Sequence, residues 1–430
     1  MASLLIKNGR VIDPASRLDG NRDILIENGK IKKIGARVRG KGARIINAKG
    51  KIVLPGLIDM HAHLRDPGQP EKETIASGTR AAARGGFTTV CCMANTDPAV
   101  DNPAVVKYVR NKAETEGAVN VYPIGAVTRG LKGEELAEMG LMLEEGAIAF
   151  SDDGKPIMRS DQMRRALEYA RQFKALVISH CEDANLSEGG SMNESALSTE
   201  IGLPGIPSLA EEVMVARDLM LAEAYGRVHI AHVSSARSVE LIRRAKKKKL
   251  QVSCETCPHY FSLTEEAVRE YETNAKVNPP LRSKADLAAV IRGLRDGTID
   301  VIATDHAPHN IEAKDVEFNL AAFGMVGLET ALSLVITKLI EPKILTWKEA
   351  IAKMTSSPAK ILNLNNKGSL KVGADADVVI VDPRAEWTVD PQKFASKSRN
   401  TPFAGWKLKG KVIYTIVGGK VVVRDGKLLA

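Results

Sequence analysis

The chain has 430 residues, of which 44% are hydrophobic and 26% charged, a composition typical of soluble globular proteins. No run of about 18 uncharged apolar residues occurs, so we expect no membrane span, and residues 1–10 lack the apolar core of a signal peptide. Five cysteines do not make a disulfide framework in a chain of this length, so a reducing cytoplasm is the expected location.

The formal net charge is +9, and the densest basic block covers residues 243–249. Such a block can bind nucleic acid. Here it ends an expected helix over residues 238–249, where cations also complement the helix dipole. No aromatic residue lies within the block, and only 4% of the chain is aromatic, which disfavours base stacking. We therefore expect a solvated helix end and no nucleic-acid partner.

Both ends of the chain are rich in short β-like runs. In residues 1–51 these runs are separated by pairs such as Asn8-Gly9 and Asn28-Gly29, which signal hairpin turns. Residues 365–430 contain similar runs at 377–382, 411–417 and 420–423. We expect the two ends to form one small composite β-sandwich.

The middle, residues 52–364, alternates apolar strand-like runs with amphipathic helical runs. Helices are expected near residues 73–84 and 103–116. Eight strands are expected, the first opening at residue 52 and the others at 87–93, 119–125, 147–150, 175–179, 228–231, 251–254 and 301–304. Eight such repeats predict an α/β fold, a closed (β/α)8 TIM-type barrel.

Residues of types that can bind metals follow most of these strands. They therefore lie at the carboxyl ends of the strands, where TIM-barrel enzymes have their active sites. In chain order they are His61 and His63, Asn95, Asp152 and Asp153, His180, His232, and Asp305 with His306 and His309. Imidazoles and carboxylates suit zinc, so this set predicts a site for one or two zinc ions. The alternative for His61 and His63 alone is a pair of hydrogen-bonded core histidines. Asp152 is expected in a turn or helix cap before Gly154.

The chain resembles the amidohydrolase superfamily and, more narrowly, the bacterial class I dihydroorotases, over essentially its whole length. The matching motifs are GLIDMHAHLRDPG (56–68), FSDDG (150–154), SHCED (179–183), HVS (232–234), VNPPLR (277–282), ATDHAPH (303–309) and SKSRNTPF (396–403). The resemblance implies that one metal is held by His61, His63 and Asp305, and a second by His180 and His232. Asp153 would be a ligand or the bridge between them. Related enzymes often bridge with a carboxylated lysine, and Lys155 lies nearby, but side-chain parity and the family pattern favour Asp153.

The implied reaction is the reversible cyclisation of N-carbamoyl-L-aspartate to L-dihydroorotate and water in de novo pyrimidine synthesis. In the hydrolytic direction a metal-held hydroxide attacks the ring amide, and Asp305 passes the proton to the leaving nitrogen. Arg65 can clamp the substrate carboxylate through two parallel hydrogen bonds. By resemblance, Asn95 and His309 assist it and Asn278 borders the ring. A salt bridge with Asp66 is the alternative for Arg65, and ordinary turn chemistry the alternative for Asn95.

Two other functions stay open. One is another cyclic amidohydrolase, such as an allantoinase or hydantoinase, which usually has a lysine at the end of the fourth strand. The other is a non-catalytic dihydroorotase-like subunit that scaffolds aspartate transcarbamoylase, although such chains tend to lack the zinc histidines. Aspartate transcarbamoylase is also the candidate partner of an active enzyme, and a homodimer is the expected assembly.

Three local features complete the predictions. Ala94 stands where the family usually has a proline, which leaves the turn that aims Asn95 less fixed. The pair Cys254 and Cys257 has no second C-x-x-C partner and is expected to pack in the barrel, and His259 is expected to be a hydrogen-bonded structural residue. The segment 310–327 is expected to form a lid, with Gly324 and Gly327 as hinges.

Overall fold

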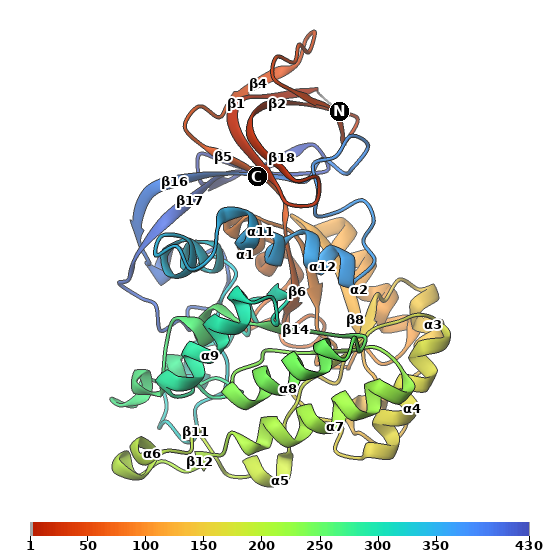
Figure 1. The fold of residues 1–430 in the computed structure, drawn as a ribbon, viewed down its shortest axis with the longest axis vertical. Helices are drawn as coiled ribbons and strands as arrows, with labels where there is room; N and C mark the ends of the chain where they lie inside the picture. The colour runs from red at the N-terminus through yellow and green to blue at the C-terminus, as the bar shows by residue number, and fades with distance from the viewer. Residues whose placement is uncertain (1–2, 430) are drawn as a thin grey trace.

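The computed structural model describes residues 3–429, which form a barrel and a sheet built from the two ends of the chain (Figure 1). The barrel strands are β6 (Leu57–Ala62), β7 (Phe87–Cys92), β8 (Asn120–Gly125), β9 (Ala149–Phe150), β10 (Val177–Ser179), β13 (Val228–Ile230), β14 (Val252–Thr256) and β15 (Val301–Ile302). They pair in parallel in this order. A parallel bridge between Ala62 and His306 joins the last strand to the first. The predicted α/β barrel is confirmed.

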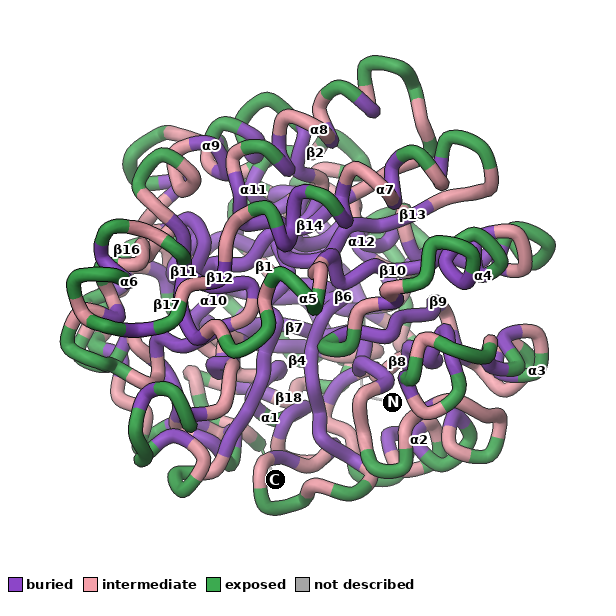
Figure 2. Tube along the Cα trace, turned by 90° about the horizontal axis from the view of Figure 1, so that it is seen from below, coloured by how far each residue is buried: buried purple, intermediate pink, exposed green. Residues whose placement is uncertain are grey.

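Helices surround this barrel. They are α1 (Ile75–Gly85), α2 (Pro103–Glu116), α3 (Met139–Glu144), α4 (Ser160–Gln172), α7 (Leu209–Tyr225), α8 (Ala236–Lys247), α9 (Lys284–Arg295), α10 (Ala331–Val335), α11 (Trp347–Met354) and α12 (Ser356–Ile361). Local sequence sets their starts. For example, Asn102 caps α2 by accepting from the N–H groups of Ala104 and Val105, and Pro103 takes the first helical position. Figure 2 shows the strands buried at the centre and exposed residues along the outer helices.

Short insertions extend the connections on one side of the barrel. They comprise α5 (Ala184–Ser187), β11 (Met192–Asn193), α6 (Ala196–Ile201) and β12 (Gly205–Ile206). β11 and β12 pair with each other as a two-stranded sheet. These four short elements all lie between β10 and α7, so they extend the loop that follows the carboxyl end of β10 at the barrel mouth.

The two chain ends form one mixed sheet of nine strands. Its members are β1 (Leu4–Asp13), β2 (Leu18–Glu27), β3 (Lys30–Gly35), β4 (Arg44–Asn47), β5 (Ile52–Pro55), β16 (Val378–Thr388), β17 (Lys407–Val417), β18 (Lys420–Arg424) and β19 (Lys427–Leu428). β5 joins the two halves, because it pairs in parallel with β1 and antiparallel with β16. The expected composite β unit of both ends is therefore present.

A single glycine connects the sheet to the barrel. Gly56 separates β5 from β6, and a Cβ atom there would lie 2.0 Å from the hydroxyl oxygen of Thr88. Only glycine permits this close approach of the two segments. The run that begins at Ile52 thus serves both units and leads directly into the strand that carries His61.

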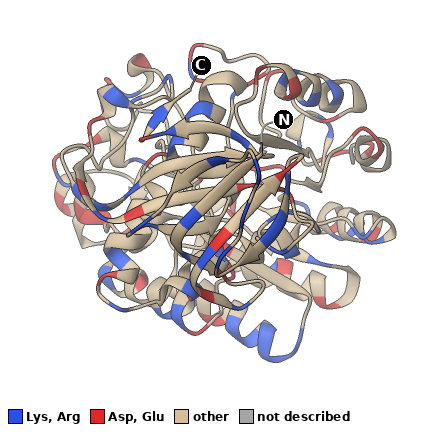
Figure 3. Cartoon of the chain, turned by 90° about the horizontal axis from the view of Figure 1, so that it is seen from above, with Lys and Arg blue, Asp and Glu red and all other residues tan. Residues whose placement is uncertain are grey.

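The expected basic helix end is α8, and its cations form local pairs. Arg243 bonds Asp296, with a guanidinium nitrogen 2.7 Å from Oδ2, and Lys246 pairs with Asp300 at 2.5 Å. In the view of Figure 3, basic and acidic residues alternate around the molecule. Among residues 3–429, no helix has the length and apolar character needed to cross a bilayer.

Candidate metal centre

All six predicted metal ligands meet at the mouth of the barrel, at the carboxyl ends of five strands. They are His61 and His63 from β6, Asp153 after β9, His180 after β10, His232 after β13 and Asp305 after β15. None of these residues is more than 8% exposed. The parallel strands explain this convergence, because their carboxyl ends open on the same rim.

Asp153 lies at the centre of the cluster. Its Oδ1 is 3.4 Å from Nε2 of His61, from Nδ1 of His180 and from Nε2 of His232. Its other oxygen, Oδ2, is 3.4 Å from Nε2 of His63. Lys155, the alternative bridge, is exposed. The carboxylate therefore faces both predicted ligand sets, as a bridge between two ions requires.

Asp305 completes the set on the side of His61 and His63. Its Oδ1 lies 3.1 Å from Nε2 of His63 and 3.6 Å from Nε2 of His61. On the other side, Nδ1 of His180 lies 2.8 Å from Nε2 of His232.

These spacings fit a divalent cation. Ligand atoms about 2.1 Å from one tetrahedral ion are about 3.4 Å apart. Two of the atoms, Nε2 of His61 and Oδ1 of Asp153, are buried and have no hydrogen-bond partner among the described residues. Buried polar atoms are rarely left unsatisfied, so this pair marks a place where a bound ion would complete the site. The donors present suit zinc and similar ions.

The histidines are oriented by acceptors that sequence reasoning did not assign. His61 Nδ1 is 2.5 Å from Glu255, His63 Nδ1 is 2.8 Å from Oδ1 of Asn95, and His180 Nε2 is 2.8 Å from Glu182. In each ring this bond holds a proton on the outer nitrogen, so the inner nitrogen can give up its own proton and present a lone pair to an ion when one is bound. Glu255 could have been found from sequence, because it directly follows the run 251–254 that was expected as a strand and so lies at a strand end.

The electrostatics of the cluster favour ionised carboxylates. Burial alone would raise the pKa of Asp153, but the charge of His61 and the close imidazoles of His180 and His232 lower that pKa well below its usual value. Glu255 is also fully buried, and attraction to His61 and His229 outweighs burial and lowers its pKa. Anionic carboxylates are the form that binds a cation.

Three residues of the site have strained backbones. Arg65, His232 and Asp305 have φ angles of 57°, 31° and 47°, in the left-handed region that side chains other than glycine rarely adopt. Such strain concentrates at functional sites, where the surrounding structure enforces it.

The four predicted substrate residues border the same mouth. Arg65 is 8% exposed, and its Nε donates to the carbonyl of Pro308 at 3.3 Å. His309 lies beside it, 3.4 Å from the guanidinium, and its Nε2 donates to the carbonyl of Phe323 at 2.8 Å. Asn278 donates to Glu182 at 2.9 Å. Asn95 contacts His63, so it supports the ligand set directly.

The turn that carries Asn95 is ordered without the family's proline. The carbonyl of Ala94 accepts hydrogen bonds from the N–H groups of Thr96 at 2.9 Å and Val100 at 3.0 Å. These bonds close the turn and hold Asn95 toward His63.

A second buried network lies behind the ligands. Gly327 N–H donates to Nδ1 of His306 at 3.2 Å, so Nε2 of this ring carries the proton and donates to Glu73 at 3.3 Å. Glu73 is fully buried and also accepts from Ser396 and from the N–H of Lys397. This network links α1, the end of β15 and the C-terminal part of the chain.

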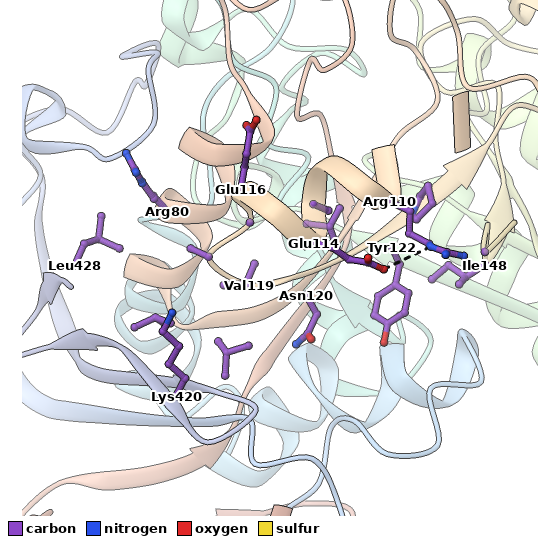
Figure 4. Close-up of a pocket in the computed structure, with 18 of the residues that line it drawn as sticks. Arg80, Arg110, Glu114, Glu116, Val119, Asn120, Tyr122, Ile148, Lys420 and Leu428 are labelled. Carbon is purple, nitrogen blue, oxygen red and sulfur yellow. Dashed lines mark ion pairs between the residues drawn. The ribbon is translucent and has the colours of Figure 1, made fainter. Parts of the chain in front are cut away.

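Two clefts differ in their relation to the cluster. One of about 980 Å³ is lined by His309, Lys314, Lys397 and Asn400, and therefore opens beside the substrate residues. The other, of about 820 Å³, is shown in Figure 4 and is lined by residues such as Tyr122, Lys420 and Leu428. It lies at the amino end of β8, the opposite end of the barrel, and contains none of the predicted site residues.

The remaining predictions concern residues outside the ligand set. Cys254 and Cys257 are free, buried thiols, in agreement with a packing role. His259 is buried beside them, but its Nε2 has no hydrogen-bond partner among the described residues, so the expected hydrogen-bonded role is not seen. Asp152 lies in a turn, as expected, because the N–H of Lys155 donates to its carbonyl at 2.9 Å. Its side chain accepts from the N–H groups of Val127 and Thr128, in the segment after β8, at 2.8 and 3.0 Å.

Comparisons with known proteins agree with this geometry. The model of the amidohydrolase family matches residues 52–422. The chain is 58% identical to a dihydroorotase of Acetivibrio thermocellus, over 99% of this chain and 100% of the relative. It is 60% identical to a dihydroorotase of Pelotomaculum thermopropionicum, over 98% and 99%. Among solved structures, it is similar to an L-hydantoinase (dihydropyrimidinase) from Arthrobacter aurescens, with a TM-score of 0.90 and 26% identity, covering 100% of this chain and 98% of that one. The chain therefore belongs to the amidohydrolase family and, within it, to the dihydroorotases.

Proposed function

We propose that this chain catalyses the reversible cyclisation of N-carbamoyl-L-aspartate to L-dihydroorotate and water, a step of pyrimidine synthesis. The observation that carries the proposal is the buried cluster of four histidines and two aspartates at the barrel mouth. It occurs in a chain that is 58–60% identical to dihydroorotases over nearly its whole length.

One or two zinc ions are the proposed cofactor. His61, His63 and Asp305 would hold one ion, and His180 and His232 the second, with Asp153 between them. When bound, the metal activates a water molecule and polarises the amide carbonyl of the substrate.

Asp305 is the proposed proton carrier. Its carboxylate is buried, and hydrogen bonding with His63 and the charge of His61 outweigh burial and lower its pKa. It therefore starts as an anion that can accept a proton from the attacking water. In the hydrolytic direction it then delivers this proton to the leaving ring nitrogen, and in cyclisation the same steps run in reverse.

Arg65 is the proposed anchor for the substrate carboxylate. Burial lowers the pKa of its guanidinium to about 10, so it remains cationic near neutral pH. Burial and the nearby charge of Arg65 lower the pKa of His309 to about 3, so this imidazole stays neutral. Asn95 and Asn278 supply amide groups beside the ligands. A buried cation next to neutral hydrogen-bonding groups suits one carboxylate of a small acid.

A second candidate is a hydantoinase-type cyclic amidase, which the similarity to a solved L-hydantoinase favours. Against it stand Asp153, where such enzymes usually have a lysine, and the buried Arg65, which suits a substrate with a carboxylate. A purely scaffolding role is disfavoured, because all six ligand positions are retained and converge.

Further assignments complete the proposal. The catalytic unit was expected to begin at residue 52, but Ile52–Pro55 is strand β5 of the terminal sheet, so we assign residues 57–364 to the catalytic unit and the segments before 56 and after 364 to the β unit. A homodimer is the proposed assembly, and aspartate transcarbamoylase the proposed partner. The five cysteines are free and buried, which suits a reducing cytoplasm.

The decisive experiment measures hydrolysis of L-dihydroorotate by the purified, zinc-loaded protein, alone and with aspartate transcarbamoylase. Hydantoin and dihydrouracil are tested in parallel. Turnover of dihydroorotate at least about 100-fold more efficient than of either neutral ring supports the proposal. Preference for a neutral ring, or no turnover with the partner present, would contradict it.

A further inference from the structure

A segment of the C-terminal unit reaches back to the barrel mouth. Residues 395–401, called the strap below, lie between β16 and β17 of the terminal sheet. Ser396, Ser398 and Asn400 are buried, each at most 4% exposed. Ser396 donates to Glu73, and Ser398 donates to the carbonyl of Lys72 at 2.7 Å. The strap is thus packed against the loop that precedes α1.

Asn400 carries the strap's contacts with the substrate side of the mouth. Its Oδ1 accepts the N–H of His309 at 3.1 Å. Its Nδ2 donates to the carbonyls of Ala307 at 3.0 Å and Gly324 at 3.1 Å, and its own carbonyl accepts the N–H of Val326 at 2.9 Å. The side chain therefore uses its acceptor and both of its donors in a buried position.

These bonds join two segments that border the site. One is the turn 307–309 after β15, and the other is the end of the 310–327 segment. The ring of His309 donates to the carbonyl of Phe323, next to Gly324, so hydrogen bonds run from Asn400 to His309, on to residues 323–324 and back to Asn400. A closed ring of this kind fixes the backbone of His309 more firmly than one contact would.

We propose that Asn400 is a positioning residue for dihydroorotate turnover: it holds His309, and the end of the 310–327 segment, where the substrate carboxylate is gripped. The inference rests on the proposed function, in which His309 assists Arg65. It makes the C-terminal unit a structural part of the active-site wall, because the cleft beside His309 is lined by His309, by the start of the 310–327 segment and by the strap.

A double-mutant cycle tests this role. The values of kcat and KM for dihydroorotate are measured in the zinc-loaded wild type, Asn400→Ala, His309→Ala and the double variant, with metal content recorded for each. We expect Asn400→Ala to raise KM about 10-fold while kcat changes less than about threefold and metal content stays the same. In the His309→Ala background, the same substitution should change kcat/KM less than about twofold. Thr415→Ala, which removes a buried hydrogen bond from the C-terminal unit to the carbonyl of Ala83 in α1 and lies outside the cleft, serves as the matched control and should leave KM unchanged.

Effects that multiply independently in the double variant, or an unchanged KM in Asn400→Ala, would overturn the inference. If the alanine variant does not fold, Asn400→Asp replaces it in the double-mutant cycle, because the aspartate keeps the acceptor for the N–H of His309 and loses both donors. A wild type without turnover would overturn the proposed function and this inference together. If the wild type turns over dihydroorotate but the two substitutions act independently in the double variant, only this inference is overturned.

Discussion

Asp305 is the residue whose replacement should separate metal binding from catalysis. An amide oxygen in Asp305→Asn can still face His63, but it cannot accept and return a proton at neutral pH. General acid–base catalysis contributes roughly 10²–10⁴-fold, so we expect kcat to fall by at least about 100-fold. Metal content, measured by mass spectrometry, should stay near that of the wild type. A variant with a near-wild-type rate would remove Asp305 from proton transfer.

Arg65 should govern affinity for the substrate more than the rate of the reaction. Arg65→Lys keeps the charge but loses the planar pair of donors that matches a carboxylate. We expect KM for dihydroorotate to rise about 10-fold or more, which corresponds to about 1.4 kcal/mol. Arg10→Lys, in an exposed ion pair with Asp19, is the matched control and should change nothing. An unchanged KM in the Arg65 variant would mean that another group binds the carboxylate.

At the scale of residues, the sequence was informative about ligands and much less so about their support. His61 and His63 are two apart on a strand, and the other ligands follow strand ends, so parity and position predicted a common centre that the structure shows. Glu182 follows His180 by two residues, so its contact with that ring could have been found from the local sequence. Glu73 was not assigned, because its partners His306 and Ser396 are far from it in sequence and only tertiary packing brings them together. Likewise, nothing in the local sequence of Asn400 indicates that it lies beside His309.

Among the elements, the 310–327 segment is held by a buried lysine. Nζ of Lys314 donates to the carbonyls of Ala322 at 2.7 Å and Gly324 at 3.0 Å. Burial, followed by the charge of Lys276, lowers the pKa of Lys314 from 10.5 to about 7. Between these two pH values the unfolded chain binds more protons than the folded one, so the free energy of unfolding rises with pH. The gain in the free energy of unfolding is lost again as the pH falls from about 10.5 to about 7.

Lys314→Met should remove this pH dependence. For one such group, the wild type gains up to about 2 kcal/mol between about pH 7 and pH 9, which should appear as a higher thermal midpoint at the upper pH. The gain in the variant should be clearly smaller, whereas Lys107→Met, at an exposed site on α2, should behave as the wild type. Equal gains in all three proteins would show that Lys314 titrates at an ordinary pKa.

Most barrel elements could be predicted from sequence, but their boundaries were less accurate. The helix expected at 103–116 is α2, whose cap and first-turn proline are local signals. The strand expected at 301–304 is only β15 (Val301–Ile302), because the backbone turns early and brings Asp305 into its left-handed conformation. The insertion between β10 and α7 was not predicted, since its short strands bury few residues and give no periodic pattern.

At the scale of the molecule, the composite sheet explains why the chain ends matter to the site. β5 joins the N-terminal and C-terminal strands and continues through Gly56 into β6, which carries His61. The strap returns from the same sheet to the barrel mouth. Both chain ends are rich in short β-like runs, and this similarity predicted that they associate. The strap's contact with the site depends on tertiary packing and could not be read from the sequence.

The cluster also predicts how the whole molecule responds to loss of its metal. Its ligands come from five strands around the barrel, so a bound ion joins segments that are far apart in sequence. Without the ion, buried atoms such as Nε2 of His61 and Oδ1 of Asp153 lack a partner. A ligand present at 100 times its Kd stabilises the folded state by about 2.7 kcal/mol.

We therefore expect chelator-treated protein to unfold about 3 °C below the zinc-loaded protein for each ion bound at this level, at the same scan rate. Addition of zinc should restore the midpoint. A His61→Asn, His180→Asn double variant, which loses a ligand from each proposed ion, is the control and should show no comparable response to zinc. If the wild type and this variant gain the same stability from zinc, the ion binds elsewhere on the molecule. If the wild type gains none although zinc is bound, the unfolded chain binds zinc as tightly as the folded one, and the ion does not stabilise the barrel.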